Sequence, residues 1–224
     1  DELTAMHANI DVRCVALDLT APGASVELFE KTRAAALEVT LLINNAGFGA
    51  FGEFAELDRE RLRQMIDLNI AAVVELTHLY LQAMYRQSET QRRVGGIINI
   101  ASVAGFIPLP YSTVYAATKA FVLSFSHALH EEARQHGVHV MVVNPGTTKT
   151  NFFEVAGKNP FGSSARMQTA AQVVDESLRA FDRGKRSITT GVSNRAIVLL
   201  TRFVPRGWIT AAIGRIRRRS EGKA

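Results

Sequence analysis

The sequence predicts an α/β fold of the doubly wound type, in which helices cover both faces of a mostly parallel sheet. Short, continuous apolar runs recur along the chain, and such runs are typical of strands buried on both faces. Segments with helical spacing of apolar residues lie between them, and this alternation is the pattern of α/β folds. With 224 residues, the chain is long enough for one sizeable core.

The predicted strands are short and apolar. In chain order they are Val12–Leu17, Val39–Ile43, Ile97–Ile100 and Val138–Val143, followed by a last short strand at Ser187–Thr190. The predicted helices are Ala24–Leu37, Asp58–Met84, Thr113–His136 and Thr169–Arg183. The polar segment Arg86–Gly96 is predicted to be a surface loop, and Asp1–Ala8 resembles the end of a helix.

Charge and composition exclude several classes of protein. The formal net charge is +5, but residues 195–224 alone carry +7, so the rest of the chain carries −2. A near-neutral body argues against a nucleic-acid-reading face. The single cysteine, Cys14, excludes an internal disulfide and fits a reducing, cytoplasmic location. No apolar run approaches the ~20 residues of a membrane-spanning helix. The six histidines show no ligand spacing, so we expect no metal.

A glycine motif at Gly47–Gly52, G-F-G-A-F-G, matches the dinucleotide-binding pattern G-x-G-x-x-G. Its context contradicts that function. The third glycine of the pattern belongs inside a helix, and an acid belongs at the end of the next strand. Here the helix start signal, Asp58, comes six residues after Gly52, and Asp67 lies in mid-helix. We therefore do not assign the pyrophosphate site to this motif.

Amides gather after the second predicted strand and in the following helix. Asn44 and Asn45 end the strand, where they can either tie neighbouring strands together or line the crevice that binds ligands in α/β sheets. Asn69 falls within an apolar helical stripe that consists of Leu62, Ile66, Val73, Leu76 and Tyr80. A buried amide needs partners, so Asn69 either bridges to nearby backbone or has a functional role.

Tyr115 and Lys119 lie four residues apart, on one face of a predicted helix. The pair is either an ordinary solvated surface pair or an acid–base device. A free tyrosine has a pKa near 10, and a fixed cation beside it would lower that pKa towards a useful range. Upstream, Ser102 follows a strand. Downstream, the string N-P-G-T-T-K-T from Asn144 to Thr150 ends the next strand in a sharp turn.

These strings, in this order and spacing, resemble the short-chain dehydrogenase/reductase family over roughly Val12 to Asn151. The matching features are Asp18-Leu19, the string N-N-A-G at Asn44–Gly47, Asn69, Ser102, the Y-x-x-x-K of Tyr115 and Lys119, and Pro145-Gly146 with Thr150 four residues on. The resemblance implies an NAD(P)-dependent oxidoreductase that interconverts a carbonyl and an alcohol. The alternative is a non-enzymatic relative that acts as a binding or dimerisation module.

The resemblance also implies a role for each matching residue. Tyr115 would exchange a proton with the substrate oxygen, Lys119 would lower the tyrosine pKa and bind the nicotinamide ribose, Ser102 would hydrogen-bond the reacting oxygen, and Asn69 would hold a relay water. Asp18 would contact the adenine, Asn45, Ala46 and Gly47 would lie along the cofactor, and Pro145, Gly146, Thr148 and Thr150 would flank the nicotinamide. The substrate would meet side chains near Phe48, Pro108, Tyr111, Phe152 and Phe153, which suggests an apolar carbonyl compound.

One part of the family pattern is missing from the sequence. The family opens with a strand, a glycine-rich turn that binds the pyrophosphate, a helix and a second strand, and nothing before Asp18 supplies these. We expect the chain to be a fragment of a longer reductase, and a natural short form is the alternative. The position that selects the cofactor belongs to that segment, so the residues present do not distinguish NAD(H) from NADP(H). The resemblance alone favours NADP(H).

The C-terminal end differs in character from the rest. We predict a dinucleotide-fold domain over residues 1–194 and an extension over 195–224, whose apolar runs Ala196–Val204 and Trp208–Ile216 end in arginines. This extension either lies on an anionic membrane surface or packs on a partner subunit. The family habit of pairing through the helices of Asn69 and Tyr115 implies a homodimer or homotetramer.

Overall fold

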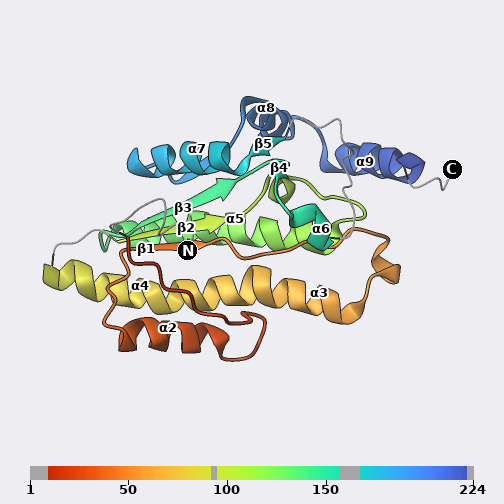
Figure 1. Ribbon diagram of the computed structural model, residues 1–224. Helices are drawn as coiled ribbons and strands as arrows, with labels where there is room; N and C mark the ends of the chain where they lie inside the picture. The colour runs from red at the N-terminus through yellow and green to blue at the C-terminus, as the bar shows by residue number, and fades with distance from the viewer. Residues whose placement is uncertain (1–9, 92–94, 157–166, 221–224) are drawn as a thin grey trace.

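A four-stranded parallel sheet forms the centre of the protein. The computed structural model describes residues 10–91, 95–156 and 167–220. The strands are β1 (Leu41–Asn44), β2 (Gly96–Ile100), β3 (His139–Asn144) and β6 (Ser187–Thr189), and they lie in the order β1-β2-β3-β6 (Figure 1). This confirms four of the five predicted strands, with no end shifted by more than two residues.

The sheet is covered on both faces, as the doubly wound prediction requires. On one face, Ile97 and Val140 pack against helices α4 (Ala72–Gln91) and α5 (Thr113–Arg134). On the other face, Ile98 and Met141 pack against helix α7 (Ala170–Asp182). Neighbouring residues of a strand point to opposite faces, so an unbroken apolar run serves both layers at once. Figure 1 shows these layers, with α4 below the sheet and α7 above it.

The long predicted helix from Asp58 is present but divided. Asp58 caps α3 (Arg59–Ile66), and its side chain accepts a hydrogen bond from the Arg61 backbone N–H at 2.7 Å. A π-helical turn, η2 (Asp67–Ala71), separates α3 from α4. Helix α4 continues to Gln91, so the predicted surface loop at Arg86–Gly96 is wrong for most of its length. The reason is that polar residues such as Gln and Glu are good helix formers on an exposed face.

The predicted strand Val12–Leu17 is not a strand. Residues 10–18 have no regular secondary structure, and the side chains of Ile10, Val12 and Val15 are 50%, 37% and 42% exposed. A strand needs a neighbour for its backbone hydrogen bonds, and none of the strands in the described ranges lies beside this segment. Among the residues that the structure describes, strand β1 is consequently an edge strand that pairs with β2 alone. The predicted helix end at Asp1–Ala8 lies outside the described residues.

Most of the remaining elements lie near the carboxyl ends of the strands, whereas the first helix packs on the side of α4 that faces away from the sheet (Figure 1). Helix α2 spans Ala24–Ala34, the short helices are η1 (Phe54–Glu56), η3 (Val103–Phe106) and α6 (Phe152–Ala156), and a second small sheet pairs β4 (Thr148–Lys149) with β5 (Gln168–Thr169). Thr169 and Gln172 form a capping box at the start of α7. At the C-terminal end lie α8 (Val192–Leu200) and α9 (Arg206–Ser220), and α8 crosses the boundary predicted at residue 194. Within the described ranges, no helix has both the length and the apolarity to cross a membrane.

Gly105 marks a place where η3 and α5 pack without room for a side chain. A Cβ atom at this position would lie 2.8 Å from the Lys119 backbone oxygen and 3.1 Å from the Ala120 nitrogen. Because backbone atoms cannot rotate away, we expect Gly105→Ala to lower the free energy of unfolding by about 1–3 kcal/mol in urea denaturation. Gly214→Ala is the matched control. A Cβ at Gly214 would lie 3.8 Å from the Pro110 Cγ, an ordinary contact distance. Because alanine favours helix more than glycine does, we expect this variant to be as stable as the wild type or more stable. Equal stability of the Gly105→Ala variant and the wild type would contradict the prediction.

Candidate active site

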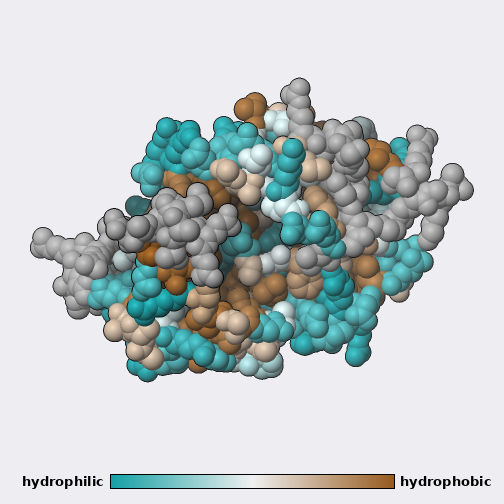
Figure 2. Space-filling view, viewed as in Figure 1, coloured by the Kyte–Doolittle hydropathy of each residue, from teal (hydrophilic) through white to brown (hydrophobic). Residues whose placement is uncertain are grey.

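A cavity of about 830 Å³ opens at the carboxyl ends of the strands, a place where open α/β sheets bind ligands. Nine of the predicted site residues line it: Asn45, Gly47, Ser102, Tyr115, Lys119, Pro145, Gly146, Thr148 and Thr150. These residues are spread over more than 100 positions of the sequence, and the parallel strands bring them to one edge of the sheet. Figure 2 shows a hollow flanked by apolar surface near the centre of this face, between α7 and the sheet.

Ser102, Tyr115 and Lys119 form a polar cluster at the wall of this cavity. Ser102 lies beside the Tyr115 phenol, and its hydroxyl oxygen accepts a hydrogen bond from the Ala104 N–H at 3.1 Å. The Lys119 ammonium donates a hydrogen bond to the Ile100 backbone oxygen at 2.9 Å and lies 5.9 Å from the centre of the Tyr115 ring. Lys119 is 6% exposed. Lys119 is therefore buried and Tyr115 half-buried at a cavity wall, and the interpretation as a solvated surface pair is wrong.

Burial controls the pKa values of both residues. Burial raises the pKa of Tyr115 to about 12, and the neighbouring Ser102 hydroxyl offsets part of this rise. Burial lowers the pKa of Lys119 to about 8, because the charged form loses its hydration. The predicted net lowering of the tyrosine pKa is thus wrong for this structure, because burial raises it, and the role of Lys119 towards the phenolate stays a prediction. At neutral pH, Tyr115 is a neutral phenol that can donate a proton.

Asn69 is fully buried behind the cavity wall and fixes the turn after β1. Its amide nitrogen donates to the Phe48 carbonyl at 3.0 Å and to the Thr118 hydroxyl at 3.1 Å, and its oxygen accepts from the Phe48 N–H at 3.2 Å. A Cβ at Gly47 would lie 2.8 Å from the Asn69 side-chain oxygen and 3.4 Å from the Lys119 nitrogen. The amide therefore bridges to backbone, which was one of the two alternatives, and the role as a holder of a relay water stays a prediction.

The two asparagines that end β1 have different surroundings. The Asn44 amide donates to the Asn99 side-chain oxygen of β2 at 2.8 Å and to the Thr77 hydroxyl of α4 at 3.0 Å, so it ties the neighbouring strand and the helix together. Asn99 in turn donates to Ser126 of α5 at 2.9 Å. Asn45, in contrast, lines the cavity. Both interpretations of the N-N pair are thus correct, one for each residue.

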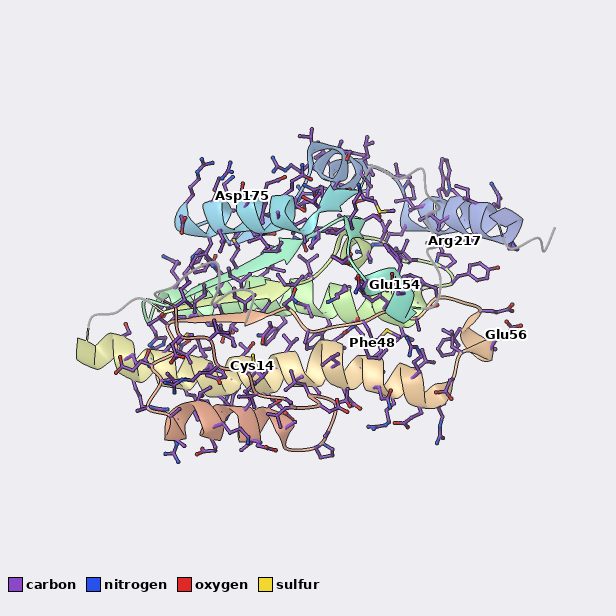
Figure 3. The ribbon with its side chains drawn as sticks, viewed as in Figure 1. Cys14, Phe48, Glu56, Glu154, Asp175 and Arg217 are labelled. Carbon is purple, nitrogen blue, oxygen red and sulfur yellow. The ribbon has the colours of Figure 1, made fainter. Side chains whose placement is uncertain are left out.

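Aromatic rings crowd the side of the cavity next to Tyr115. The Phe152 ring centre lies 5.5 Å from that of Tyr115, and the Phe51 ring centre lies 6.3 Å from it. Phe153 also lines the cavity, as predicted, and packs on Phe51. Phe48, Pro108 and Tyr111, which were expected to wall the substrate pocket, are not among the lining residues. Phe48 instead packs under the Arg61 guanidinium, 5.1 Å from the ring centre to the Arg61 carbon, near α3 (Figure 3).

Two other predicted cofactor residues stand apart from this cluster. Asp18 does not line the cavity. Its carboxylate accepts hydrogen bonds from the backbone and the hydroxyl of Thr20, and these bonds lower the pKa of Asp18. Ala46 is exposed between Asn45 and Gly47. The segment Gly47–Gly52 does not open a helix, in agreement with the rejection of its G-x-G-x-x-G pattern.

Sequence reasoning missed the contribution of α7 and α8. Val173 and Ser177 of α7 and Ser193, Asn194 and Ile197 of α8 line the cavity. The Asn194 side chain lies so close to Gly146 that a Cβ there would come within 2.2 Å of its nitrogen. Glu176 holds this region together, because it accepts hydrogen bonds from Gln168, the Gly191 N–H and Arg195. No motif marks these residues, although Gly191 before a helix is a weak signal of a special backbone position.

The fold and the site define a Rossmann-like α/β protein with a serine, tyrosine and lysine at the carboxyl edge of its sheet. The chain belongs to the short-chain dehydrogenase family, since the family model "short chain dehydrogenase" matches residues 1–160. It is 36% identical over 153 residues to human very-long-chain 3-oxoacyl-CoA reductase. The aligned residues make up 65% of this chain and 46% of that protein. An oxidoreductase of Staphylococcus saprophyticus is 33% identical over 151 residues, covering 67% of this chain and 61% of that one.

Solved structures agree with this membership. A short-chain dehydrogenase from Sphingobium yanoikuyae in complex with NADPH has a TM-score of 0.77 and 30% identity, covering 88% of this chain and 75% of that chain. A 7beta-hydroxysteroid dehydrogenase has a TM-score of 0.78 and 26% identity, covering 95% and 80%. The chain spans about half the length of the curated relatives it matches first, 46% in the case of the human protein.

The residues of the cavity fit one end of a nicotinamide dinucleotide. The buried Lys119 ammonium has a single hydrogen bond partner, the Ile100 oxygen, in the described structure, so it can donate further hydrogen bonds to a ligand. Ser102, Thr148 and Thr150 add hydroxyl groups to the lining of the cavity. The pyrophosphate end has no such match: among the residues the structure describes, no glycine-rich turn at a helix N-terminus lines the cavity. Nor do these residues include a cluster of side chains suited to a metal ion.

Proposed function

We propose that this chain carries the catalytic centre of an NAD(P)-dependent reductase that interconverts a carbonyl and an alcohol. The observation that supports it most strongly is the joint placement of Ser102, Tyr115 and Lys119 on one wall of a large cavity. A bound reduced nicotinamide supplies a hydride, and the protein supplies position and a proton. NADPH is the favoured cofactor, because the Sphingobium yanoikuyae relative is described in complex with it.

In this proposal each residue has one task. Tyr115, held neutral by burial, donates its proton to the substrate oxygen as the carbonyl is reduced. Ser102 hydrogen-bonds the same oxygen and stabilises the negative charge that develops on it. Lys119 lies where its ammonium stabilises the phenolate left on Tyr115, and it holds the nicotinamide ribose. Asn45, Gly47, Pro145, Gly146, Thr148 and Thr150 position the nicotinamide, Asn69 keeps the turn at Phe48 in place, and Asp18 and Ala46 contact the rest of the cofactor.

The favoured substrate is an apolar carbonyl compound. The rings of Phe51 and Phe152 lie beside the ring of Tyr115, and Phe153 packs on Phe51. Aliphatic residues of β1, β2 and α7 also line the cavity. An apolar wall contributes roughly 25 cal/mol for each Å² of apolar substrate surface that it removes from water. A long-chain 3-oxoacyl thioester is a suitable first substrate, since it is what the name of the human relative describes. We propose a cytoplasmic homodimer or homotetramer.

Transfer of deuterium tests the proposal. With NADPH that carries deuterium at nicotinamide C4, we expect the label at the carbinol carbon of the product when 3-oxododecanoyl-CoA is reduced. A parallel titration of NADPH and NADH fluorescence measures binding of each cofactor. Saturable binding with no labelled product from any ketone would favour the non-enzymatic binding module instead. Absence of both binding and transfer would overturn the assignment for this chain.

A further inference from the structure

Helix α8 presents an apolar stripe to solvent. Val192, Ala196, Leu199, Leu200 and Phe203 recur at helical spacing, so they lie on one side of α8 and of the turn that follows it. All five are exposed, and Val192, Leu199, Leu200 and Phe203 are 79%, 54%, 62% and 78% exposed. The opposite side of the helix, with Val198 at 8%, packs on the protein. An outward apolar stripe of this size indicates a binding surface.

Helix α9 continues this surface with a tryptophan and arginines. Ile213 packs on the cluster of Ala104, Leu109 and Ala116, and Arg217 is buried on the same side of the helix, facing the body of the molecule (Figure 3). Trp208, which is 75% exposed, and Arg215 lie seven residues apart on the opposite, outward side. Figure 1 shows α8 and α9 along one edge of the molecule.

The charge of this region is entirely positive. Residues 192–220 contain seven arginines and no aspartate or glutamate. Four of these arginines, Arg202, Arg206, Arg215 and Arg218, are exposed, and within the described part of the chain none of the four forms an ion pair. A second copy of the chain that docked symmetrically through this surface would bring like charges together, which disfavours self-association here.

An anionic lipid surface satisfies both features at once. Apolar side chains and tryptophan enter the boundary between headgroups and acyl chains, while arginines around them attract anionic headgroups. We propose that the chain docks on anionic membranes through a tail surface that consists of Val192, Ala196, Leu199, Leu200, Phe203 and Trp208, with Arg202, Arg206, Arg215 and Arg218 at its rim.

The tail surface adjoins the cavity. Ser193, Asn194 and Ile197 of α8 line the cavity, and they are neighbours in sequence of the outward stripe. Docking would therefore hold the cavity close to the lipid phase, where apolar carbonyl compounds concentrate. This consequence rests on the proposed function, whereas docking itself does not.

The sole tryptophan of the chain, Trp208, makes the test direct. With vesicles of phosphatidylcholine and 30% phosphatidylserine at low salt, we expect a blue shift of Trp208 emission and co-sedimentation of the chain. Both should weaken with pure phosphatidylcholine and with added salt. Each arginine near such a membrane contributes about fivefold to partitioning, so Arg215→Glu with Arg218→Glu should lower partitioning at least about 25-fold. Leu199→Ser with Leu200→Ser should lower it at constant charge.

The matched control is Arg59→Glu with Arg134→Glu, which makes the same change of charge on α3 and α5. We expect this control to bind nearly as the wild type does. An equal loss in the control would mean unspecific attraction and would overturn the proposal, as would absence of a blue shift on anionic vesicles. A dimer in light scattering that the leucine variants dissociate would assign the surface to a second copy instead. No cofactor or substrate enters these assays, so their outcome is independent of the reductase activity.

Discussion

Tyr115→Phe should lower kcat for carbonyl reduction by about 10²–10⁴-fold, the range that a positioned general acid contributes. The phenol lies at the cavity wall beside Ser102, where as a neutral group it can donate a proton. The ring itself packs on Phe51 and Phe152, and phenylalanine keeps those contacts. We therefore expect the fold and cofactor binding to be unchanged, so that the loss lies in kcat.

Steady-state kinetics with NADPH and a saturating ketone measure this effect, and cofactor fluorescence measures binding in the same variant. Tyr85→Phe is the control. Tyr85 stacks on His136, with ring centres 4.2 Å apart, and does not line the cavity. Loss of the Tyr85 hydroxyl should leave kcat close to the wild-type value. A Tyr115→Phe variant that keeps more than about a tenth of wild-type kcat would remove Tyr115 from the proton-donor role.

Lys119→Met should abolish most activity without a comparable loss of stability. The side chains are similar in length, but methionine cannot stabilise the phenolate or hold the ribose. Burial lowers the pKa of Lys119 to about 8, so the folded protein carries an ammonium at neutral pH at a cost in free energy. Methionine removes this cost and gives up the hydrogen bond to the Ile100 oxygen. We expect a free energy of unfolding near pH 7 that is equal to the wild-type value or higher.

The pH dependence of stability separates this effect from a packing change. Between pH 8 and 10.5 the unfolded chain keeps the Lys119 proton while the folded chain releases it, so wild-type stability rises with pH relative to Lys119→Met. A shift from 10.5 to about 8 corresponds to about 3 kcal/mol over this window. Urea denaturation of both proteins at several pH values measures the difference. A difference that is constant from pH 7 to 10.5 would contradict the lowered pKa.

The local pattern of apolar residues correctly predicted those strands that have a pairing partner in the sheet. The runs at Ile97–Ile100 and Val138–Val143 became β2 and β3, because each finds a parallel partner and two apolar layers. Val12–Leu17 has the same composition and did not become a strand, since backbone pairing requires a neighbour that no local pattern can supply. The helix end after Arg86 was misjudged for a related reason: polarity marks exposure, and exposed residues extend helices as readily as they form loops.

The sequence by itself determined which residues are the candidates for the chemistry. The order of Asn45, Ser102, Tyr115, Lys119 and Gly146 identified the family, and these residues meet at one cavity, because parallel strands carry their carboxyl ends to the same edge. It also determined the uniformly basic end of the chain, which is a property of composition alone.

Only the tertiary structure decided how these groups behave. Burial, which depends on every element around the site, raises the pKa of Tyr115 and lowers that of Lys119, whereas spacing alone had suggested a lowered tyrosine pKa. The tertiary structure likewise decided that Asn69 hydrogen-bonds Phe48 and Thr118, and that the apolar stripe of α8 faces outward. Desolvation and packing are sums over atoms that are distant in the sequence, so they exist only once the chain has folded.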